Sequence, residues 1–375
     1  MRSVKLFESD FDSAEVEAAS EVVVSGWLTN GEKTLQFEEA IAHCIGVESE
    51  NVVAVSSCTA ALHLALILDG VGFGDEVIVP ALNFVSDANV CVAVGARPVF
   101  CDIESLEKWT PNVSNIERLI TPKTKAMILT HFAGIPAPDV VEIATLCRRK
   151  GITLIEDCAH ALGASLEGNY CGTFGDYAAF SFYSNKNIAT GEGGALLSNR
   201  ASNARQLRSH GMTTSTLDRE KGRAFSYDVT APGLNYRIDE IRSAIGLCQI
   251  AKFDKKHAIR RSIVNQYLKL LEGSRIISPF NYIVDGAVSV DHIMPILLPS
   301  KANRNEVMRH LLSAGIQTSI HYPAPWNMTA YQHVAECQLP ISSEVISREL
   351  TLPLHTLMKG SDAAYVVEKL HELCA

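Results

Sequence analysis

The segment Gly151-Ile-Thr-Leu-Ile-Glu-Asp-Cys-Ala-His160 passes from an apolar, strand-like run directly into a cluster of polar side chains. A second segment of the same kind, Ala178-Ala-Phe-Ser-Phe-Tyr-Ser-Asn-Lys186, ends in a lysine. In open α/β sheets, ligands bind at the carboxyl ends of the strands, where such side chains gather. We therefore expect Asp157 and Lys186 to face one pocket, with a surface ion pair between them as the alternative interpretation.

Short apolar runs alternate with helical patterns around these two segments. The runs are rich in β-branched, aromatic or other apolar residues, and several are bounded by Gly, Pro or Asp, as strands typically are. They are Asn51–Val55, Glu76–Pro80, Arg97–Asp102, Lys125–His131, Gly151–Glu156, Ala178–Tyr183 and Gly194–Leu197. Helical patterns fit between the early runs, at Cys58–Leu68, Val85–Val94 and Pro138–Lys150. The alternation predicts an α/β fold in which helices cover both faces of a mostly parallel sheet.

The pattern changes after Ser209, and the C-terminal part is expected to form a smaller α+β domain. Asp239–Leu271 has the periodicity of a long helix with a break near Phe253. Strand-like runs and amphipathic helices follow it, at Asp291–Leu298, Arg304–Ala314, Ser319–Tyr322 and Asp362–Leu373. We place the boundary at residue 250, which gives a large domain of residues 1–250 and a small domain of residues 251–375.

Composition excludes several classes of function. The chain of 375 residues is 47% apolar and carries 33 Lys and Arg against 42 Asp and Glu, a net charge of −9. An acidic chain without a basic block is a poor ligand for nucleic acids and for anionic membranes. Its most apolar window, Ala60–Leu68, is too short to span a bilayer. Ten cysteines without a C-x-x-C pair predict reduced thiols, a cytoplasmic protein and no metal site.

Two further strand-end segments complete a set of groups that one cofactor requires. Ser57 and Thr59 stand at the start of a helix, where hydroxyls and free amides can cap the helix or bind a phosphate. Phe84 supplies an aromatic ring on another strand-end loop. With the lysine and the carboxylate, these groups suit pyridoxal phosphate (PLP), because the amine can form a Schiff base and the carboxylate can hold the pyridine nitrogen protonated. Neither a P-loop nor a G-x-S-x-G motif supports a competing chemistry.

These segments, in this order, resemble the DegT/StrS family of PLP-dependent sugar aminotransferases. The resemblance extends from about Gly26 to His355, nearly the whole chain. The similar motifs are Ser57-Cys-Thr-Ala-Ala-Leu-His-Leu-Ala65, Gly74-Asp-Glu-Val-Ile-Val-Pro80, Phe84-Val-Ser-Asp-Ala-Asn89, Ile155-Glu-Asp-Cys-Ala-His-Ala-Leu-Gly163, Phe180-Ser-Phe-Tyr-Ser-Asn-Lys-Asn187, Gly191-Glu-Gly-Gly194 and Gly233-Leu-Asn-Tyr-Arg237. The resemblance implies fold type I, with a mixed, mostly parallel seven-stranded sheet in the large domain. It also implies a homodimer whose subunits share their active sites.

The resemblance further implies a role for each residue that matches a family motif. Lys186 would form the Schiff base, Asp157 would bind the pyridine nitrogen, and His160 would lie near the ring oxygen of the cofactor. The other cofactor contacts would be Cys58, Thr59, Ala60, Phe84, Ser181 and, from the partner subunit, Asn235. The substrate contacts would be Gly26, Trp27, Leu28, Thr29, Asn235, Arg237, His321, Tyr322 and Pro323. Cys58 departs from the small Gly or Ala that the family usually has at its position.

The implied reaction is a transamination in two halves. L-glutamate donates its amino group, and a keto-sugar, for which we favour a nucleotide-linked 4-keto-6-deoxyhexose, accepts it. Lys186, once released, would act as the general acid and base. A non-nucleotide keto-cyclitol is an alternative substrate, because a fold does not determine a function. A PLP-dependent dehydratase of the same family, which carries His in place of the lysine, and a PLP-binding sensor are further alternatives.

Overall fold

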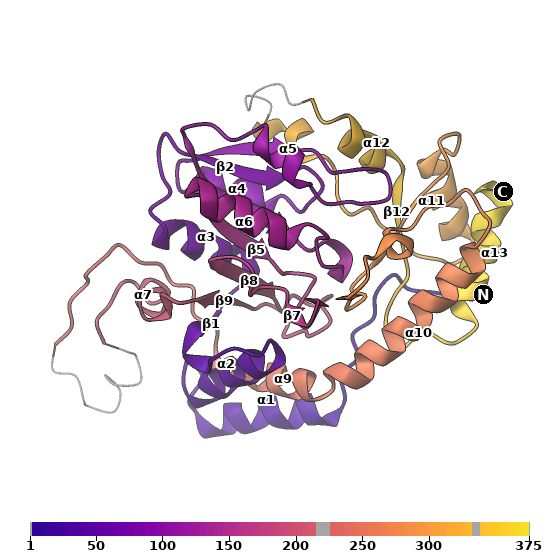
Figure 1. Ribbon diagram of the computed structural model, residues 1–375. Helices are drawn as coiled ribbons and strands as arrows, with labels where there is room; N and C mark the ends of the chain where they lie inside the picture. Colours follow the sequence, from indigo (N-terminus) through magenta and orange to yellow (C-terminus); the bar gives the residue numbers. More distant parts are fainter. Residues whose placement is uncertain (1, 215–225, 332–337, 375) are drawn as a thin grey trace.

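The computed structural model describes residues 2–214, 226–331 and 338–374 (Figure 1). Its centre is a seven-stranded sheet in the order β1-β9-β8-β5-β4-β2-β3. Strand β9 is antiparallel to both of its neighbours, and the other adjacent pairs are parallel. The strands are β1 (Val52–Val55), β2 (Glu76–Pro80), β3 (Arg97–Cys101), β4 (Thr124–Thr130), β5 (Thr153–Asp157), β8 (Tyr177–Ser181) and β9 (Gly194–Ser198). The predicted mixed, mostly parallel sheet is confirmed, and each strand end lies within two residues of its predicted position.

Alternate residues of each strand face two different layers of helices. In β1, for example, Val53 and Val55 belong to one buried apolar cluster, whereas Val52 and Ala54 belong to another. This alternation follows from the two-residue repeat of a β-strand. The first face is covered by α3 (Cys58–Leu68), α4 (Ser86–Ala93) and α7 (Ala201–Leu207). The opposite face is covered by α2 (Glu32–Cys44), α5 (Val113–Glu117) and α6 (Val140–Lys150).

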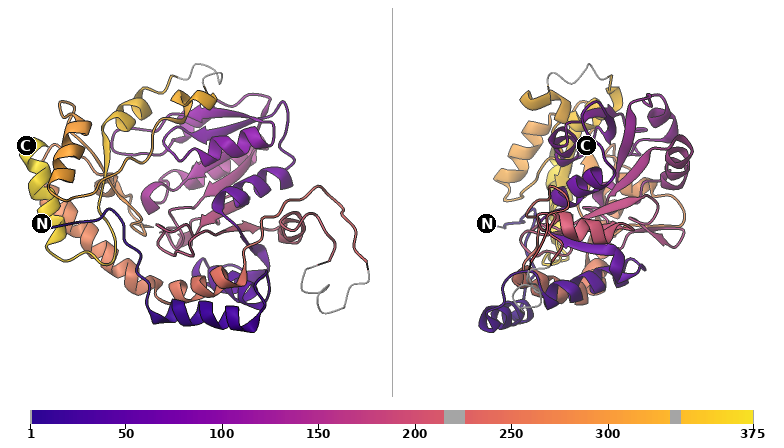
Figure 2. Two further views of the ribbon diagram at one scale, coloured as in Figure 1. Left: turned by 180° about the vertical axis from the view of Figure 1, so that it is seen from behind. Right: turned by 90° about the vertical axis from the view of Figure 1, so that its left-hand side faces the viewer.

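Two consecutive helices lead from the sheet into the C-terminal part, as the periodicity predicted. Helices α9 (Glu240–Ala251) and α10 (Phe253–Leu271) are separated by Lys252 alone. Helix α1 (Ser13–Ser25) lies along α9, and the left panel of Figure 2 shows both below the sheet. The first residues of the chain also join this part, because Val4 forms a bridge with Ile316 and packs in the same core. The division of the chain at residue 250 stays a prediction.

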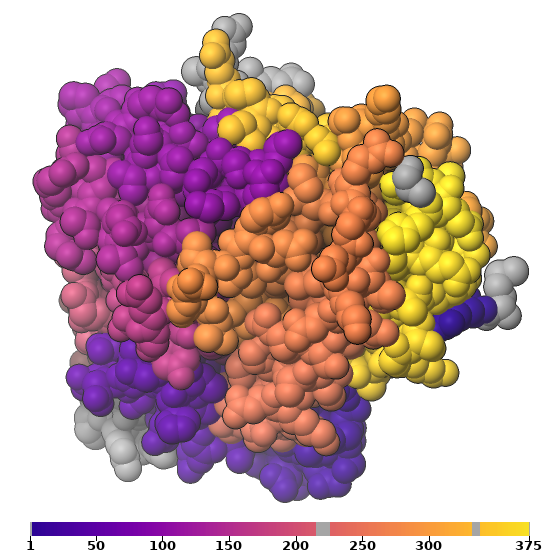
Figure 3. All heavy atoms as spheres, turned by 45° about the vertical axis from the view of Figure 1, so that its right-hand side comes forward, coloured from indigo at the N-terminus to yellow at the C-terminus, as the bar shows by residue number. Residues whose placement is uncertain are grey.

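The C-terminal part contains a two-stranded antiparallel sheet between helices. Its elements are β11 (Met294–Leu297), α11 (Arg304–Ser313), α12 (Pro340–Arg348), β12 (Glu349–Leu352) and α13 (Asp362–Cys374). The expected strand at Ser319–Tyr322 is reduced to a single bridge between Ser319 and Thr351. The pairing stops there because the amide of His321, two residues after Ser319, donates to the side chain of Glu349 instead of a backbone carbonyl. In Figure 3 this orange and yellow part packs directly against the purple and magenta sheet-containing part.

A small third sheet and several 3-10 turns complete the described structure. The sheet joins β6 (Ser165–Leu166), β7 (Asn169–Tyr170) and β10 (Ala287–Val288). The turns are Ser49–Asn51, Phe132–Gly134, Pro279–Tyr282, Pro325–Asn327 and Thr329–Tyr331. Within the ranges that the structure describes, no helix combines the length and the apolar character that crossing a bilayer requires.

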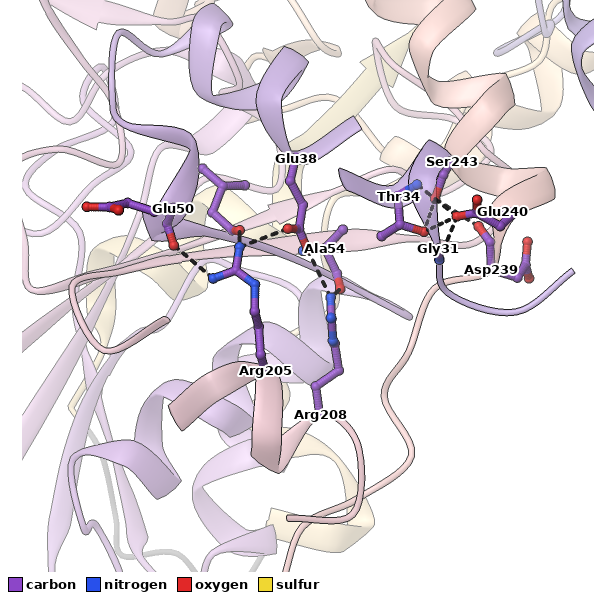
Figure 4. Close-up of polar contacts among 11 residues, drawn as sticks. Gly31, Thr34, Glu38, Glu50, Ala54, Arg205, Arg208, Asp239, Glu240 and Ser243 are labelled. Carbon is purple, nitrogen blue, oxygen red and sulfur yellow. Dashed lines mark hydrogen bonds and ion pairs between the residues drawn. The ribbon is translucent and has the colours of Figure 1, made fainter. Parts of the chain in front are cut away.

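Two buried glutamates fasten α2 to the remainder of the chain (Figure 4). Glu240 accepts hydrogen bonds of 2.7–2.9 Å from the hydroxyl of Thr34 and from three backbone amides at the start of α2. It therefore caps α2, whose N-cap residue, Gly31, has no side chain that could do so. Glu38 accepts from the amide of Ala54 at 2.9 Å and pairs with Arg208 at 3.0 Å. Arg208 also donates to the carbonyl of Ala54, so both sides of this β1 residue are held.

Candidate active site

A cavity of about 410 Å³ opens at the carboxyl edge of the large sheet. Its walls come from the loops that follow β1, β2, β5 and β8, together with the segment at His321. Ten residues that the sequence analysis singled out meet here: Ser57, Cys58, Thr59, Phe84, Asp157, His160, Ser181, Lys186, His321 and Tyr322. The expectation that Asp157 and Lys186 face one pocket is confirmed.

The turn between β1 and α3 forms one end of the cavity. Ser57 caps α3, and its hydroxyl oxygen accepts the amide of Ala60 at 3.1 Å. Thr59 is exposed to the cavity, whereas Ala60 is buried in the first turn of the helix and does not line the cavity. Gly194 lets this turn lie close to β9, because a Cβ atom at residue 194 would lie 2.3 Å from the carbonyl carbon of Ser57. This end has the amides and hydroxyls that hold a phosphate at a helix N-terminus.

Asp157 lies at the end of β5, almost completely buried. One of its carboxylate oxygens accepts the amide of Ala159 at 2.9 Å and lies 3.6 Å from the thiol of Cys58. The other lies 3.3 Å from the side-chain amide of Asn83. These contacts orient the carboxylate at the cavity wall. Asp157 is far from the phosphate-binding turn in the sequence, but both line the same cavity.

A second carboxyl group, that of Asp87, lies behind this wall. The side-chain amide of Asn83 bonds to Asp87 as well as to Asp157, and Thr130 joins the same cluster. Burial and the neighbouring carboxylate of Asp157 raise the pKa of Asp87 well above its ordinary value. The environment of Asp87 therefore favours the protonated form of its carboxyl group.

Lys186 reaches the cavity from the loop after β8. Burial lowers the pKa of its ammonium group from 10.5 to about 8, although Asp157 and Cys58 act in the opposite direction. A lysine with this pKa is mainly protonated at pH 7, but its neutral amine, which is the form that attacks a carbonyl carbon, is far more abundant than in an ordinary lysine. The environment of Lys186 is thus suited to Schiff-base chemistry.

The two predicted histidines, His160 and His321, are both buried in neutral form. Nδ1 of His160 accepts the amide of Ala133 at 3.2 Å, so Nε2 carries the proton and donates to the hydroxyl of Tyr322 at 3.0 Å. Burial lowers the pKa of His160 well below its ordinary value, and Lys186 adds to this effect. Burial likewise lowers the pKa of His321 to about 4. Both imidazoles are therefore neutral near pH 7.

Comparison with known proteins identifies the type of site. Residues 9–371 match the DegT/DnrJ/EryC1/StrS aminotransferase family. The chain belongs to this family. It is 35% identical over 375 residues to a dTDP-4-dehydro-2,3,6-trideoxy-D-glucose 4-aminotransferase of Saccharopolyspora spinosa, with 98% of this chain and 96% of the relative covered.

Solved structures of family members superpose closely on the chain. The aminotransferase TlmJ from Streptoalloteichus hindustanus has a TM-score of 0.91 at 34% identity, with 98% of each chain covered. The PLP form of the putative sugar aminotransferase Spr1654 from Streptococcus pneumoniae has a TM-score of 0.91 at 28% identity, also with 98% of each chain covered. The chain is accordingly a fold type I aminotransferase that uses PLP, and the predicted fold, enzyme class and cofactor are confirmed.

The residues of this DegT-family cavity fit PLP. The helix N-terminus at Ser57 suits its phosphate, the carboxylate of Asp157 suits its pyridine nitrogen, and Lys186 suits its aldehyde carbon. The ring of Phe84 is 53% exposed and lies 5.3 Å from the ring of Tyr322, so it offers an aromatic face to a planar ligand. The cavity volume lies in the range of small-molecule sites.

Several predicted residues do not line the cavity of this chain. The stretch Gly26–Thr29 follows α1, and Leu28 in it is 47% exposed. Asn235 and Arg237 lie on an extended segment along the edge strand β1, where Arg237 forms a bridge with Val55 and the side chain of Asn235 is exposed. Pro323 follows Tyr322 but is not part of the cavity wall.

The structure adds residues to the site that the sequence analysis missed. Asn83 and Thr130 line the cavity, and Asp87 and His292 lie just behind it. Asn83 directly precedes Phe84, and Thr130 is the last residue of β4, so both carried a strand-end signal. His292 is far from the other site residues in the sequence, and no local pattern marks it.

A buried group of possible metal ligands lies beneath the site. Ligand atoms of His131, Glu156 and Cys158 are within 4.8 Å of one another. The carboxylate of Glu156 already accepts a hydrogen bond from His131 at 2.9 Å and three backbone amides between Gly172 and Gly175. Because these bonds satisfy the carboxylate, the group is explained as structural support for the end of β5.

Proposed function

We propose that the chain transfers the amino group of L-glutamate to a nucleotide-linked 4-keto-6-deoxyhexose. The observation that carries this proposal is the presence of Lys186 and Asp157 in one cavity. The chain that forms this cavity is 35% identical, over nearly its full length, to a 4-aminotransferase whose named substrate is a dTDP-linked 4-keto sugar. Other similar structures include a sugar aminotransferase and PseC of Helicobacter pylori, an aminotransferase involved in pseudoaminic acid biosynthesis.

The proposed mechanism assigns each described group one task. When bound, PLP supplies an electron sink for the carbon that loses its proton. The turn at Ser57 and Thr59, with the hydroxyl of Ser181, holds the phosphate. Asp157 holds the proton on the pyridine nitrogen. Lys186 leaves the cofactor when the amino donor binds, and its Nζ then carries the proton from one carbon to the other.

Two histidines and two aromatic rings complete the proposed site. Neutral His160 donates from Nε2 toward Tyr322 and fixes the phenol at the cavity wall. The backbone amide of neutral His321 donates to the side chain of Glu349, and its Nδ1 lies 2.9 Å from the hydroxyl oxygen of Thr351. We assign the sugar to the space between this segment and Phe84, because that side of the cavity is open to solvent at the exposed ring.

We infer that the active form is a homodimer in which each subunit completes the site of the other. Two observations support this. Gly26–Thr29, Asn235 and Arg237 do not line the cavity of their own chain. Outward-facing apolar side chains also gather on α1 and its surroundings, among them Val16, Val23, Val24, Leu28 and Leu35.

A complementation experiment tests the sharing of sites. Lys186→Ala and Asn235→Asp are each expected to be inactive as homodimers. In a hybrid of the two chains, one site would combine an intact Lys186 with an intact Asn235 of the other subunit. We expect the purified hybrid to recover about half of the wild-type activity per dimer, since one of its two sites is intact. A hybrid without activity would refute site sharing.

The substrate is tested with the amino-loaded enzyme. Protein carrying pyridoxamine phosphate is mixed separately with a dTDP-linked 4-keto-6-deoxyhexose and with a keto-cyclitol, and the return of the PLP absorption is followed. We expect the sugar nucleotide to restore the band much faster. Restoration by the keto-cyclitol alone would replace the proposed substrate with the alternative class. Release of water without amino transfer would support a dehydratase, although Lys186 occupies the place where that enzyme carries His.

We further propose that the protein works in the cytoplasm. The cysteines within the described ranges are all free thiols, and most of them are buried. Free thiols persist in a reducing compartment.

A further inference from the structure

His292 lies directly behind Lys186, and neither the predicted site nor the cavity wall includes it. Its Nε2 is 3.5 Å from Nζ of Lys186, and its ring centroid is 4.4 Å from that of His160. The side chain is almost completely buried. A buried imidazole this close to the Schiff-base lysine affects whatever the lysine does after its release from the cofactor.

The hydrogen bonds of Asn187 determine which nitrogen of His292 carries the proton. The side-chain amide nitrogen of Asn187 donates to the carbonyl of Val290 at 2.7 Å, so its oxygen is the atom that lies 3.4 Å from Nδ1 of His292. An oxygen at this place requires a proton on Nδ1. Nε2 is therefore an acceptor, and its lone pair faces the amine of Lys186.

The backbone around His292 is fixed, so the imidazole cannot move away easily. The amides of Val290 and His292 donate to the carbonyls of Gly134 and Ala133, each at 3.0 Å. Arg260, which is buried, donates to the carbonyl of His292 at 3.1 Å. The acceptor nitrogen is thus built into a rigid loop.

The charges around this pair keep the imidazole neutral. Burial lowers the pKa of His292 well below its ordinary value, and Lys186, His160, Arg260 and His321 act in the same direction. The carboxylate of Asp157, in contrast, favours the ammonium form of Lys186. A neutral His292 can accept a hydrogen bond from the ammonium group of Lys186 but does not compete with it for the proton.

We propose that His292 is a positioning residue for Lys186, on the basis of the Nε2-to-Nζ approach and the fixed Nδ1 proton. When Lys186 leaves the cofactor, its Nζ–H donates to Nε2 of His292, and this bond keeps the amine beside the carbon atoms between which it moves a proton. No bond is made or broken at His292 itself. The proposal rests on the proposed function, since it assigns a task to the released lysine.

Three variants test it. His292→Phe removes the acceptor and keeps a planar ring, whereas His292→Gln can offer an amide oxygen in its place. His257→Phe is the matched control, because His257 bonds to the carbonyl of Ser289 on the same loop at 2.9 Å. Steady-state kinetics give kcat and KM. In protein loaded with pyridoxamine phosphate, where Lys186 is free, labelling by acetic anhydride at different pH values and mass spectrometry give the pKa of Lys186.

The expected result separates positioning from a loss of structure. One hydrogen bond to a charged group corresponds to about a tenfold effect or more, so we expect kcat of His292→Phe to fall at least about tenfold with KM within about threefold. The pKa of free Lys186 should fall by about one unit, because the acceptor stabilises the ammonium form. His292→Gln should recover most of both changes, and His257→Phe should resemble the wild type.

Several outcomes would overturn the proposal. A wild-type kcat and labelling profile in His292→Phe would show that the bond has no role. The same losses in His257→Phe would assign the effect to the loop instead of the acceptor. Should His292→Phe not fold, His292→Leu removes the same acceptor with a smaller side chain and decides the question. Failure of the proposed function is distinguishable, because the wild-type protein would then show no turnover with L-glutamate and the keto sugar, whereas the labelling of free Lys186 would still report its bond to His292.

Discussion

Replacing Lys186 by methionine should make the cofactor-free protein more stable, although it abolishes activity. The lysine lines a partly enclosed cavity, and burial lowers its pKa from 10.5 to about 8 in spite of the attraction of Asp157. This difference of about 2.5 pH units corresponds to about 3 kcal/mol at ~1.36 kcal/mol per unit. Methionine has a similar length and no charge, so Lys186→Met should be up to about 3 kcal/mol more stable at pH 7.

The pH dependence of this gain follows from the proton count. Below about pH 8, Lys186 is protonated in both the folded and the unfolded chain, and the folded state carries the full unfavourable free energy of the buried charge. Between about pH 8 and 10.5 the unfolded chain holds the proton and the folded chain does not, so wild-type stability rises with pH. The advantage of Lys186→Met should therefore shrink to less than about 1 kcal/mol at pH 10.

Urea denaturation of the two cofactor-free proteins at pH 7 and pH 10 measures the difference. Lys301→Met serves as the control, because Lys301 is exposed and its replacement should change little. Equal stability of wild type and Lys186→Met at pH 7 would refute the reasoning. An advantage that is the same at both pH values would also refute it, since the gain would then come from packing and not from the charge.

Three further substitutions test other parts of the site and its support. Asp157→Asn should lower kcat at least about a hundredfold in the half-reaction with L-glutamate, because an unprotonated pyridine is a poor electron sink, and unchanged kinetics would contradict the assigned role. Gly194→Ala should raise the Kd for PLP more than about tenfold, since its Cβ would collide with the phosphate-binding turn; equilibrium titration with PLP checks this. Glu38→Gln should destabilise the protein by about 3 kcal/mol in urea, because Arg208 would remain buried without its carboxylate, and a loss below about 1 kcal/mol would contradict the importance of this ion pair.

The sheet and the strand-end residues could be predicted from the sequence because their signals are local. Each of the seven strands is a short apolar run, and Asp157, Lys186 and Thr59 lie at the end of such a run or within five residues of it. Helix α1 also had a local signal, the capping box formed by Asp12 and Glu15, which the sequence analysis did not use. The expected strand at Ser319–Tyr322 was wrong because the amide of His321 donates to the buried side chain of Glu349 instead of a backbone carbonyl of the neighbouring strand.

Other parts of the site depend on tertiary contacts that no local pattern contains. The pKa of Asp87 is raised because the residue is buried next to Asp157, which is 70 residues away in the sequence. His292 contacts Lys186 only because the loop after β10 is held against the residues that follow β4. Neither environment could be read from the order of residues along the chain.

The measurement that tests the central claim most directly is the absorption spectrum of the purified, PLP-loaded protein before and after addition of L-glutamate. We predict a visible band from the cofactor bound to Lys186, and its conversion by L-glutamate to the absorption of pyridoxamine phosphate. Lys186→Ala should lack the band of the lysine-bound cofactor. A wild-type protein that PLP does not colour would contradict the assignment of Lys186, and a band that L-glutamate leaves unchanged would contradict the proposed amino donor.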